Sequence, residues 1–138
     1  MSAFKKLANL FLLGGMLLTS GIAGAGEGGE GGGGGSKDML AKVEAIVVNL
    51  NEPTTHYLQI EMTLKLAKPD VAEKIKLYMP VIRHKLILLL SSKNTSQLES
   101  IEGNRKLVEE SKRAINQALE LSEKEGVTDV LFNSFIIQ

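Results

Sequence analysis

The sequence predicts an α+β domain in which about three strands form a small antiparallel sheet and two helices pack on one of its faces. Three observations lead to this class. Residues 56–67 alternate between apolar and polar side chains, as in a strand with one wet face. Apolar residues in 71–91 and in 102–125 recur at steps of three and four, as in amphipathic helices. The order strand, strand, helix, helix, strand then needs only one sheet with both helices on the same side.

The chain of 138 residues divides into a glycine-rich N-terminal piece and one domain-sized remainder. Twelve of its 14 glycines lie in the first 35 positions. We therefore expect residues 1–25 to be a signal peptide or an N-terminal membrane anchor, residues 26–36 to be a flexible tether, and residues 37–138 to be one folded domain. The tether, GEGGEGGGGGS, offers no apolar side chain to bury and reaches roughly 18 Å as a random coil.

Residues 1–25 have the parts of an export or anchoring segment. Two lysines in the first six residues precede an uncharged stretch, residues 7–26, which is most apolar at its start and ends in small residues. These are the parts of a signal peptide cleaved after Ala25. The alternative is an uncleaved anchor, because twenty uncharged helical residues span about 30 Å, the thickness of one hydrocarbon core. Both interpretations place the domain outside the cytoplasm.

Composition argues against several classes of function. Lys+Arg and Asp+Glu both total 16, so the formal net charge is zero, which disfavours a nucleic-acid binder with a basic face. The absence of cysteine excludes disulfides, thiol nucleophiles and thiolate metal sites. An aromatic content of 4% disfavours a stacking platform for single-stranded nucleic acid.

The first two strands are predicted to form a hairpin. Residues 42–51 are rich in β-branched apolar side chains, and residues 56–67 alternate strictly in polarity. Turn-forming residues, among them Pro53, separate the two. A short turn between two strands favours antiparallel pairing. The apolar side chains expected on one face of the second strand are Leu58, Ile60, Met62, Leu64 and Leu66.

A long helix is predicted from Val71 to Ser91, with Asp70 capping its first turn. Pro80 lies inside it and is expected to kink it, because proline removes one backbone hydrogen bond and clashes with the preceding turn. Residues 85–90 (KLILLL) are apolar on most sides and are expected to be the most buried part. The expected core stripe contains Val71, Ile75, Met79, Ile82, Leu86 and Leu89, widened by Leu77, Val81, Leu88 and Leu90.

The C-terminal part is predicted as a polar loop, a second helix and a third strand. Residues 91–100 form the loop, residues 102–125 form the helix, and Gly126 ends that helix in a left-handed conformation. The strand covers residues 127–138, and its apolar side chains on both faces suggest a central strand or one that meets a partner. Its two expected faces are Val130, Phe132 and Ile136 on one side, and Leu131, Phe135 and Ile137 on the other.

The sequence offers no catalytic, cofactor-binding or metal-binding residues. His56 begins a strand and His84 lies in the first helix, and neither has an acidic side chain at a zinc-ligand spacing. A solvated helix face accounts for Arg83 and Lys85 beside His84. We expect no enzyme, since catalytic carboxylate pairs need enclosed surroundings. The charged side chains of the second helix, all expected to be solvated, are Lys106, Glu109, Glu110, Lys112, Arg113 and Glu120.

Four stretches of the domain match, in order, the pattern of a known family. They are VVNLNE (Val47–Glu52), HYLQIEMTL (His56–Leu64), MPVIRHKLILLLSSK (Met79–Lys93) and VTDVLFNSFIIQ (Val127–Gln138). The third has a proline, then Ile-Arg, then a leucine-rich run that ends in Leu-Ser, and the fourth closes the chain with Phe-x-x-Phe-hydrophobic-x-Gln. Over about 97 residues the chain therefore resembles the flagellar basal-body-associated protein FliL family.

This resemblance implies a non-enzymatic protein without a cofactor. It implies an anchor in the bacterial inner membrane, residues 7–25 here, and a periplasmic domain similar to the stomatin-type (SPFH) fold. It further implies association with the flagellar stator complex at its periplasmic linker region, and self-association, for example in a ring. The expected roles are support of torque, swimming and swarming motility, and chemotaxis-linked control of flagellar rotation.

The chain departs from the family pattern near its start. The apolar segment contains several glycines and ends in small residues, and Ala45 stands where many relatives have a proline before the first strand's apolar run. The alternative is therefore a protein cleaved after Ala25, which would be a soluble periplasmic binding or adaptor module not linked to torque. Nucleic acid is not an expected partner in either case.

Overall fold

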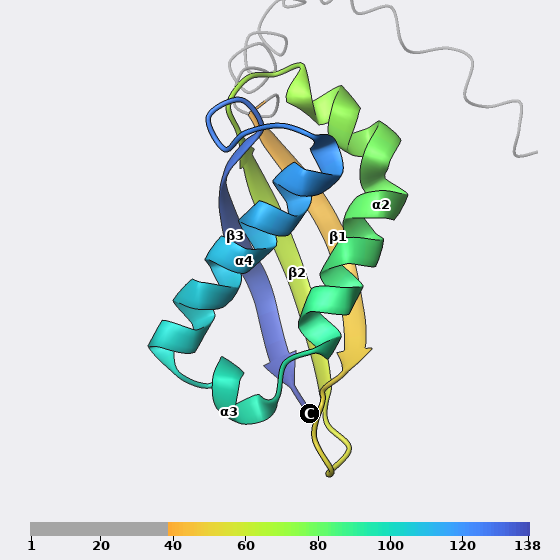
Figure 1. Cartoon of the computed structure of the whole chain (residues 1–138), viewed down its shortest axis with the longest axis vertical. Helices are drawn as coiled ribbons and strands as arrows, with labels where there is room; N and C mark the ends of the chain where they lie inside the picture. The colour runs from red at the N-terminus through yellow and green to blue at the C-terminus, as the bar shows by residue number, and fades with distance from the viewer. Residues whose placement is uncertain (1–38) are drawn as a thin grey trace, which may run out of the picture. The chain divides into compact units, whose positions relative to one another are not determined.

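The computed structural model describes residues 39–138 and confirms the α+β class with a three-stranded antiparallel sheet. The strand order is β1-β2-β3, and α2 and α4 lie on the same face of the sheet (Figure 1). The predicted export segment and tether, residues 1–36, lie outside the described residues. The elements are β1 (Leu40–Asn49), β2 (Tyr57–Leu66), α2 (Val71–Ser91), α3 (Thr95–Leu98), α4 (Ile101–Leu119) and β3 (Val127–Ile137).

Strand β2 is central, and its alternation of polarity fixes the core as predicted. Its five inward apolar side chains are all buried, since strands flank β2 on both sides and helices cover its inner face. Ile60, for example, pairs with Ile46 of β1 and Phe135 of β3. Burying one such side chain stabilises the fold by roughly 1.5–3 kcal/mol. The fully buried side chains of the two long helices include Ile75, Ile82, Leu86, Leu90, Leu107 and Ile115.

Strand β3 lies at an edge of the sheet, so the prediction of a central strand is wrong. No residue of β2 lies opposite Asn133 in the strand register, because Phe132 pairs with Met62 while Ser134 pairs with Glu61. Such a bulge shifts the alternation of side chains by one residue. The predicted division of apolar side chains between the two faces is therefore wrong beyond this point.

The bulge places both phenylalanines of β3 on the inner face. Phe132 and Phe135 stack with their ring centroids 5.8 Å apart, and together with Ile137 they pack against the core. Leu131 and Ile136 lie on the outer face and are 39% and 42% exposed. The second apolar face of β3 is thus smaller than the sequence suggested.

Helix α2 has the predicted bounds, but several of its features differ from the prediction. The Asp70 side chain makes no capping hydrogen bond, so the predicted cap is wrong. The helix continues through Pro80, and its ribbon bends along its length (Figure 1). The expectation that residues 85–90 are the most buried part is also wrong, because Ile87 and Leu88 are 40% and 59% exposed. None of the helices in residues 39–138 has both the length and the apolar character needed to cross a membrane.

The segment between α2 and β3 holds two differences from the prediction. The predicted loop contains the short helix α3, which the Asn94 side chain caps by accepting the backbone N–H of Gln97. Helix α4 ends at Leu119, earlier than predicted, and Glu120 adopts the left-handed conformation, with φ 56° and ψ 40°. The assignment of that conformation to Gly126 is therefore wrong.

Gly126 is required for a different reason, the close approach of α4. A Cβ atom on this residue would lie 2.3 Å from the Oδ1 atom of Asn116 and 3.0 Å from the Cβ atom of Leu121. Any larger residue would therefore push against the buried amide of Asn116.

One of the charged side chains that we expected to be solvated is buried. Lys112 is 8% exposed, and its Nζ atom lies 3.0 Å from a Glu109 oxygen and 3.6 Å from a Glu123 oxygen. The hydrogen bond to Glu109 raises the pKa of Lys112 above its ordinary value, and the nearby carboxylate charges add to the effect. Lys112 thus belongs to the packing of α4 and not to its solvated face.

The left-handed residue at the end of α4 gives a stability prediction. Glu120→Gly should raise the free energy of unfolding by about 1 kcal/mol, because a residue with a Cβ atom is strained in this conformation. Urea unfolding of the full chain measures the change. Gln117→Gly, inside the same helix, should change stability by a similar amount in the opposite direction. Equal losses in both variants would contradict the prediction.

Candidate functional site

The two histidines belong to different elements of the structure. His56 lies just before β2 and His84 lies on the exposed side of α2. Within residues 39–138, no group of three His, Asp or Glu side chains could hold a metal ion.

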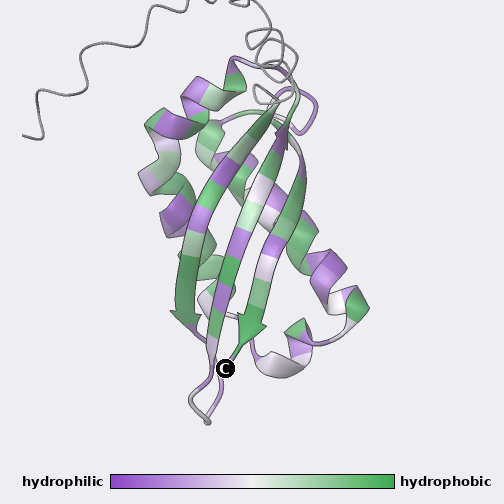
Figure 2. Cartoon of the chain, turned by 180° about the vertical axis from the view of Figure 1, so that it is seen from behind, coloured by the Kyte–Doolittle hydropathy of each residue, from purple (hydrophilic) through white to green (hydrophobic). Residues whose placement is uncertain are grey.

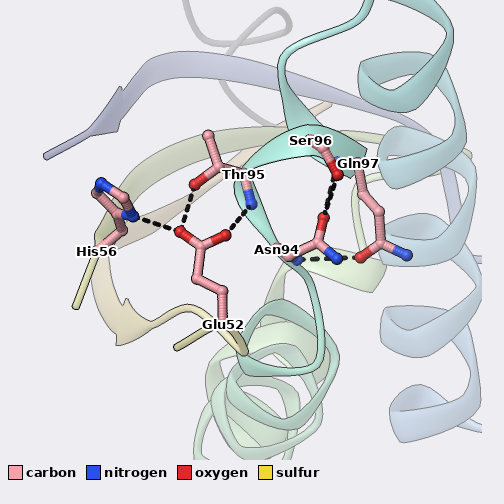
Figure 3. Close-up of polar contacts among 6 residues, drawn as sticks. All are labelled: Glu52, His56, Asn94, Thr95, Ser96 and Gln97. Carbon is pink, nitrogen blue, oxygen red and sulfur yellow. Dashed lines mark hydrogen bonds and ion pairs between the residues drawn. The ribbon is translucent and has the colours of Figure 1, made fainter. Parts of the chain in front are cut away.

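A carboxylate ties the β1–β2 turn to the connection between α2 and α3 (Figure 3). Glu52 accepts two hydrogen bonds from Thr95, one from the hydroxyl at 2.6 Å and one from the backbone N–H at 2.9 Å. The Nδ1 atom of His56 contacts the same carboxylate. The backbone N–H of Asn51 also donates to the carbonyl of Lys93 at 2.8 Å. The turn and the connection therefore form one unit.

The hydrogen bonds to the Glu52 carboxylate lower its pKa. The hydroxyl of Thr95, followed by its backbone N–H, lowers the pKa of Glu52 below the ordinary value of 4.5. The His56 contact adds to the lowering, while burial opposes it. Glu52 is thus held in its charged form, which is the form that accepts all of these bonds.

The lowered pKa predicts an acid-dependent contribution to stability. The unfolded chain takes up a proton at Glu52 near pH 4.5, but the folded chain does so only at a lower pH. The contribution is therefore complete above about pH 4.5 and is lost as the pH falls through the folded pKa. We expect the stability difference between wild type and Glu52→Gln to shrink below pH 4.5 in thermal unfolding. Glu99→Gln, at an exposed position, serves as the control, and a difference for Glu52→Gln that is independent of pH would contradict the prediction.

Arg83 reaches from α2 to the edge strand β1. Its guanidinium donates to the backbone carbonyls of Glu44 and Ala45, at 3.0 and 3.1 Å. These two residues form a bulge between Val43 and Ile46, where the pairing with β2 shifts. A planar guanidinium suits two adjacent acceptors. Arg83 is therefore not simply part of a solvated face, as the sequence suggested, but caps the bulge of an edge strand.

Removal of this cap should destabilise the domain. Arg83→Met is expected to lower the free energy of unfolding by about 1–3 kcal/mol, since two carbonyls lose hydrogen bonds from a charged donor. Arg83→Lys should lower the free energy of unfolding by less, because an ammonium group can still reach one carbonyl. Urea unfolding of the full chain, with Lys85→Met on the same helix as the control, measures both. A loss no larger than that of Lys85→Met would show that the cap contributes nothing.

No helix in residues 39–138 covers the outer face of the sheet (Figure 2). Polar side chains of β2 occupy its middle, and apolar side chains lie mainly toward its edges. The exposed apolar side chains of this face are Leu40, Val47, Tyr57, Leu131 and Ile136. This mixed face includes the outer side of β3, which is the predicted partner contact.

The outward side of α2 is a second surface, and the prediction that its apolar residues belong to the core is wrong. Leu77, Val81 and Leu88 are 75%, 43% and 59% exposed. Pro80 and Ile87 lie beside them and are also exposed. Exposed apolar side chains that lie together on one side of a helix are candidates for a contact.

Comparison with known proteins identifies the family. The pattern of the family described as flagellar basal body-associated protein FliL matches residues 40–138, which is nearly all of the described domain. The flagellar protein FliL of Aquifex aeolicus is 36% identical over 93 residues, or 67% of this chain and 56% of that protein. The flagellar protein FliL of Escherichia coli K12 is 31% identical over 97 residues, or 70% of this chain and 62% of that protein.

These relatives extend beyond the matched region. The chain spans about three fifths of the length of the curated relatives that it matches. The family match includes every feature described above, namely the loop carboxylate, the Arg83 cap, α2 and the C-terminal strand. The family consists of accessory proteins of the flagellum and is not an enzyme family. The chain belongs to the flagellar basal body-associated protein FliL family.

Proposed function

We propose that this chain is a non-enzymatic protein of the flagellar basal body that associates with the motor stator. Its roles are support of torque, of swimming and swarming motility, and of chemotaxis-linked control of rotation. The family match over residues 40–138 carries the proposal, because it spans every described element and the C-terminus.

The proposed location is the periplasmic face of the bacterial inner membrane. Residues 7–25 form a single-pass anchor, residues 26–36 form a tether, and residues 37–138 form a periplasmic domain with a stomatin-type fold. The uncharged stretch of residues 7–26, preceded by two lysines, supports the anchor and its orientation. The tether lets the domain work at a distance from the membrane.

The proposed mechanism is scaffolding. Copies of the domain associate around the periplasmic linker region of the stator, for example in a ring, and hold the stator in its engaged state. The sheet, backed by α2 and α4, supplies a rigid body. The outer sheet face, with Leu131 and Ile136 of β3 exposed, supplies a surface for contact between subunits or with the stator.

A second candidate is a soluble periplasmic adaptor that is not linked to torque. The small residues before position 26 favour it, because they fit a signal-peptidase site after Ala25. Mass spectrometry of the native protein separates the two candidates. A mature chain beginning at Gly26 supports the adaptor, and an intact N-terminus in the membrane fraction supports the anchor.

A deletion strain tests the proposed function. We expect loss of the gene to reduce swimming or swarming, and the full chain to restore it. A version in which a cleavable signal peptide replaces residues 1–25 should restore it poorly if the anchor is needed. Unchanged motility in the deletion strain would overturn the role in torque. Full restoration by the exported soluble version would support the second location instead.

A further inference from the structure

One side of α2 carries an exposed apolar stripe. Leu77, Val81 and Leu88 follow one another at steps of four and seven residues, a spacing that returns to the same side of a helix. The stripe covers about 16 Å of the helix, since each residue adds about 1.5 Å. Pro80 and Ile87 widen it on one side. The stripe therefore offers a continuous aliphatic surface to something outside the domain.

The flanks of the stripe are basic. At about 100° of rotation per residue, Lys74 and Lys85 lie along one flank and Lys76 lies on the other. Glu73 is the only acidic side chain of α2, and it pairs with Lys76 at 3.4 Å. Helix α2 carries four basic side chains and one acidic side chain, although residues 39–138 as a whole carry 13 of each. Positive charge is thus concentrated around the exposed apolar side of a domain that is neutral overall.

We propose that the exposed side of α2 docks on the surface of a bilayer that contains anionic lipid. The apolar side chains of the stripe enter the boundary between headgroups and acyl chains, and the flanking lysines contact the lipid phosphates. Lysine suits this position, because its methylene groups pack on apolar surface while its ammonium group extends to the headgroups. The helix lies on the bilayer and does not cross it, since its other side packs on the sheet and on α4.

The composition of this side of α2 favours lipid over a protein partner. Protein interfaces are enriched in aromatic residues and arginine and are depleted in lysine. The stripe is aliphatic, and the single arginine of α2, Arg83, is already bound to carbonyls of β1. The single aromatic residue, Tyr78, lies on a flank, with the Nζ atom of Lys74 5.9 Å from its ring centroid. Tyrosine and lysine are both typical of the level of the lipid headgroups.

The chain enters the described domain beside α2. Leu40, the first residue of β1, lines a hollow together with Ala72, Lys76 and Met79 of α2. The proposal rests on the anchor of the proposed function, which holds the domain near the bilayer through a tether that reaches roughly 18 Å. The bilayer is therefore kept within reach of the exposed side of α2, so that even a weak contact is populated.

Fluorescent probes on the full chain test the contact. The chain contains no cysteine, so a single introduced cysteine carries the only probe. A nitrobenzoxadiazole group is attached at Leu77→Cys or Leu88→Cys, and at Leu131→Cys on the outer sheet face as the control. The labelled chains are reconstituted into vesicles of phosphatidylcholine alone or mixed with phosphatidylglycerol, and brominated lipid serves as the quencher. Vesicle flotation first removes any chain that is not bound.

The probes on α2 should differ from the control. In vesicles with phosphatidylglycerol, we expect the emission at positions 77 and 88 to shift to shorter wavelength and to be quenched several-fold more than at position 131. In phosphatidylcholine alone the quenching should be weaker, because each lysine strengthens the attraction to an anionic surface about fivefold. High salt should also weaken the quenching, since it screens exposed charges.

Three variants separate the role of α2 from that of net charge. Lys74→Glu with Lys85→Glu should reduce quenching of the probe at position 88 several-fold in vesicles with phosphatidylglycerol. Lys65→Glu with Lys124→Glu changes the net charge equally at exposed positions outside α2 and should reduce the quenching little. Val81→Gln, which leaves every lysine in place, should reduce it by removing an apolar side chain. Urea unfolding of each variant checks that the domain remains folded.

Several outcomes would overturn the proposal. Equal quenching at positions 88 and 131 would show that α2 does not contact lipid. A shifted emission at position 88 without quenching would mean that a protein, such as a second copy, covers the stripe instead. Equal effects of the two pairs of charge reversals would mean that net charge, and not α2, draws the domain to the bilayer.

Failure of this contact and failure of the proposed function give different results. A chain that floats with neither kind of vesicle would overturn both the contact and the proposed anchor. A chain that floats but keeps the probe at position 88 in water would overturn the contact alone. Unchanged motility in the deletion strain, with the lipid contact present, would remove the proposed function alone.

Discussion

Replacing Asn116 with alanine is expected to lower the free energy of unfolding by about 3 kcal/mol. The side-chain amide of Asn116 donates to the carbonyl of Val127 at 2.9 Å and accepts from its N–H at 2.8 Å. Asn116 is 4% exposed and Val127 is fully buried. Alanine would therefore leave a buried donor and a buried acceptor without partners at the first residue of β3.

Urea unfolding of the full chain measures this loss of stability. Two further variants serve for comparison. Asn116→Asp keeps an acceptor for the N–H of Val127 but faces its carbonyl with a carboxylate, so it should also be destabilising. Gln117→Ala, at the exposed neighbouring position, should change stability by less than about 0.5 kcal/mol. Exchange of the Val127 amide hydrogen should accelerate in Asn116→Ala relative to other strand amides. If Asn116→Ala loses no more stability than Gln117→Ala, the N–H and carbonyl of Val127 have found other hydrogen-bond partners.

The sequence is sufficient to predict the elements whose apolar side chains recur at a regular spacing. The alternation in β2 identified its buried face, because a strict period of two over ten residues fits only a half-buried strand. The bounds of α2 were predicted correctly, because its apolar spacing begins after Pro69-Asp70 and ends in polar residues. The order of elements then left one economical arrangement of layers.

Features that depend on a single inserted residue were not predictable in this way. No residue of β2 lies opposite Asn133 in the strand register, and nothing in the neighbouring sequence marks a bulge, so the predicted faces of β3 are wrong beyond it. The left-handed residue at the end of α4 is Glu120, whereas the only local signal was Gly126. That glycine is required by contact with Asn116, which lies ten residues earlier in the chain.

Side chains that bind residues distant in the sequence also cannot be recognised from their neighbours in the chain. Arg83 binds carbonyls 38 and 39 residues away, and Glu52 binds Thr95 at a separation of 43 residues. A periodic pattern describes one element at a time. It therefore predicts Arg83 only as part of a solvated helix face and Glu52 only as part of a turn. Neither residue type points to a partner by itself, because a charged side chain in a turn or on a helix is ordinarily solvated.

The exposed side of α2 shows where hydrophobicity alone misleads. Leu77 and Leu88 look like core residues in sequence, yet a layer of two helices on a three-stranded sheet can cover only one side of α2. The strongly apolar composition of this helix is therefore best explained by a contact outside the domain. Core positions and contact positions both carry apolar residues, so the sequence alone does not separate them.

Gly103→Ala is expected to lower the free energy of unfolding by about 1–3 kcal/mol, although alanine normally stabilises a helix relative to glycine. A Cβ atom at this position would lie 1.9 Å from the backbone oxygen of Gln97 and 2.9 Å from the Oγ atom of Ser100. Either α3 or the first turn of α4 must move. That movement strains the cap in which Ser100 accepts the N–H of Gly103 at 2.9 Å.

Urea unfolding of the full chain tests this prediction, with Lys106→Ala, exposed in the same helix, as the control. A stability equal to that of wild type would mean that α3 moves away freely. The Glu52 carboxylate, which holds Thr95 at the start of α3, argues against free movement. The double variant Glu52→Gln with Gly103→Ala should therefore lose less stability than the sum of the single losses, because release of α3 relieves the clash. Simple additivity would show that Glu52 does not restrain α3 against α4.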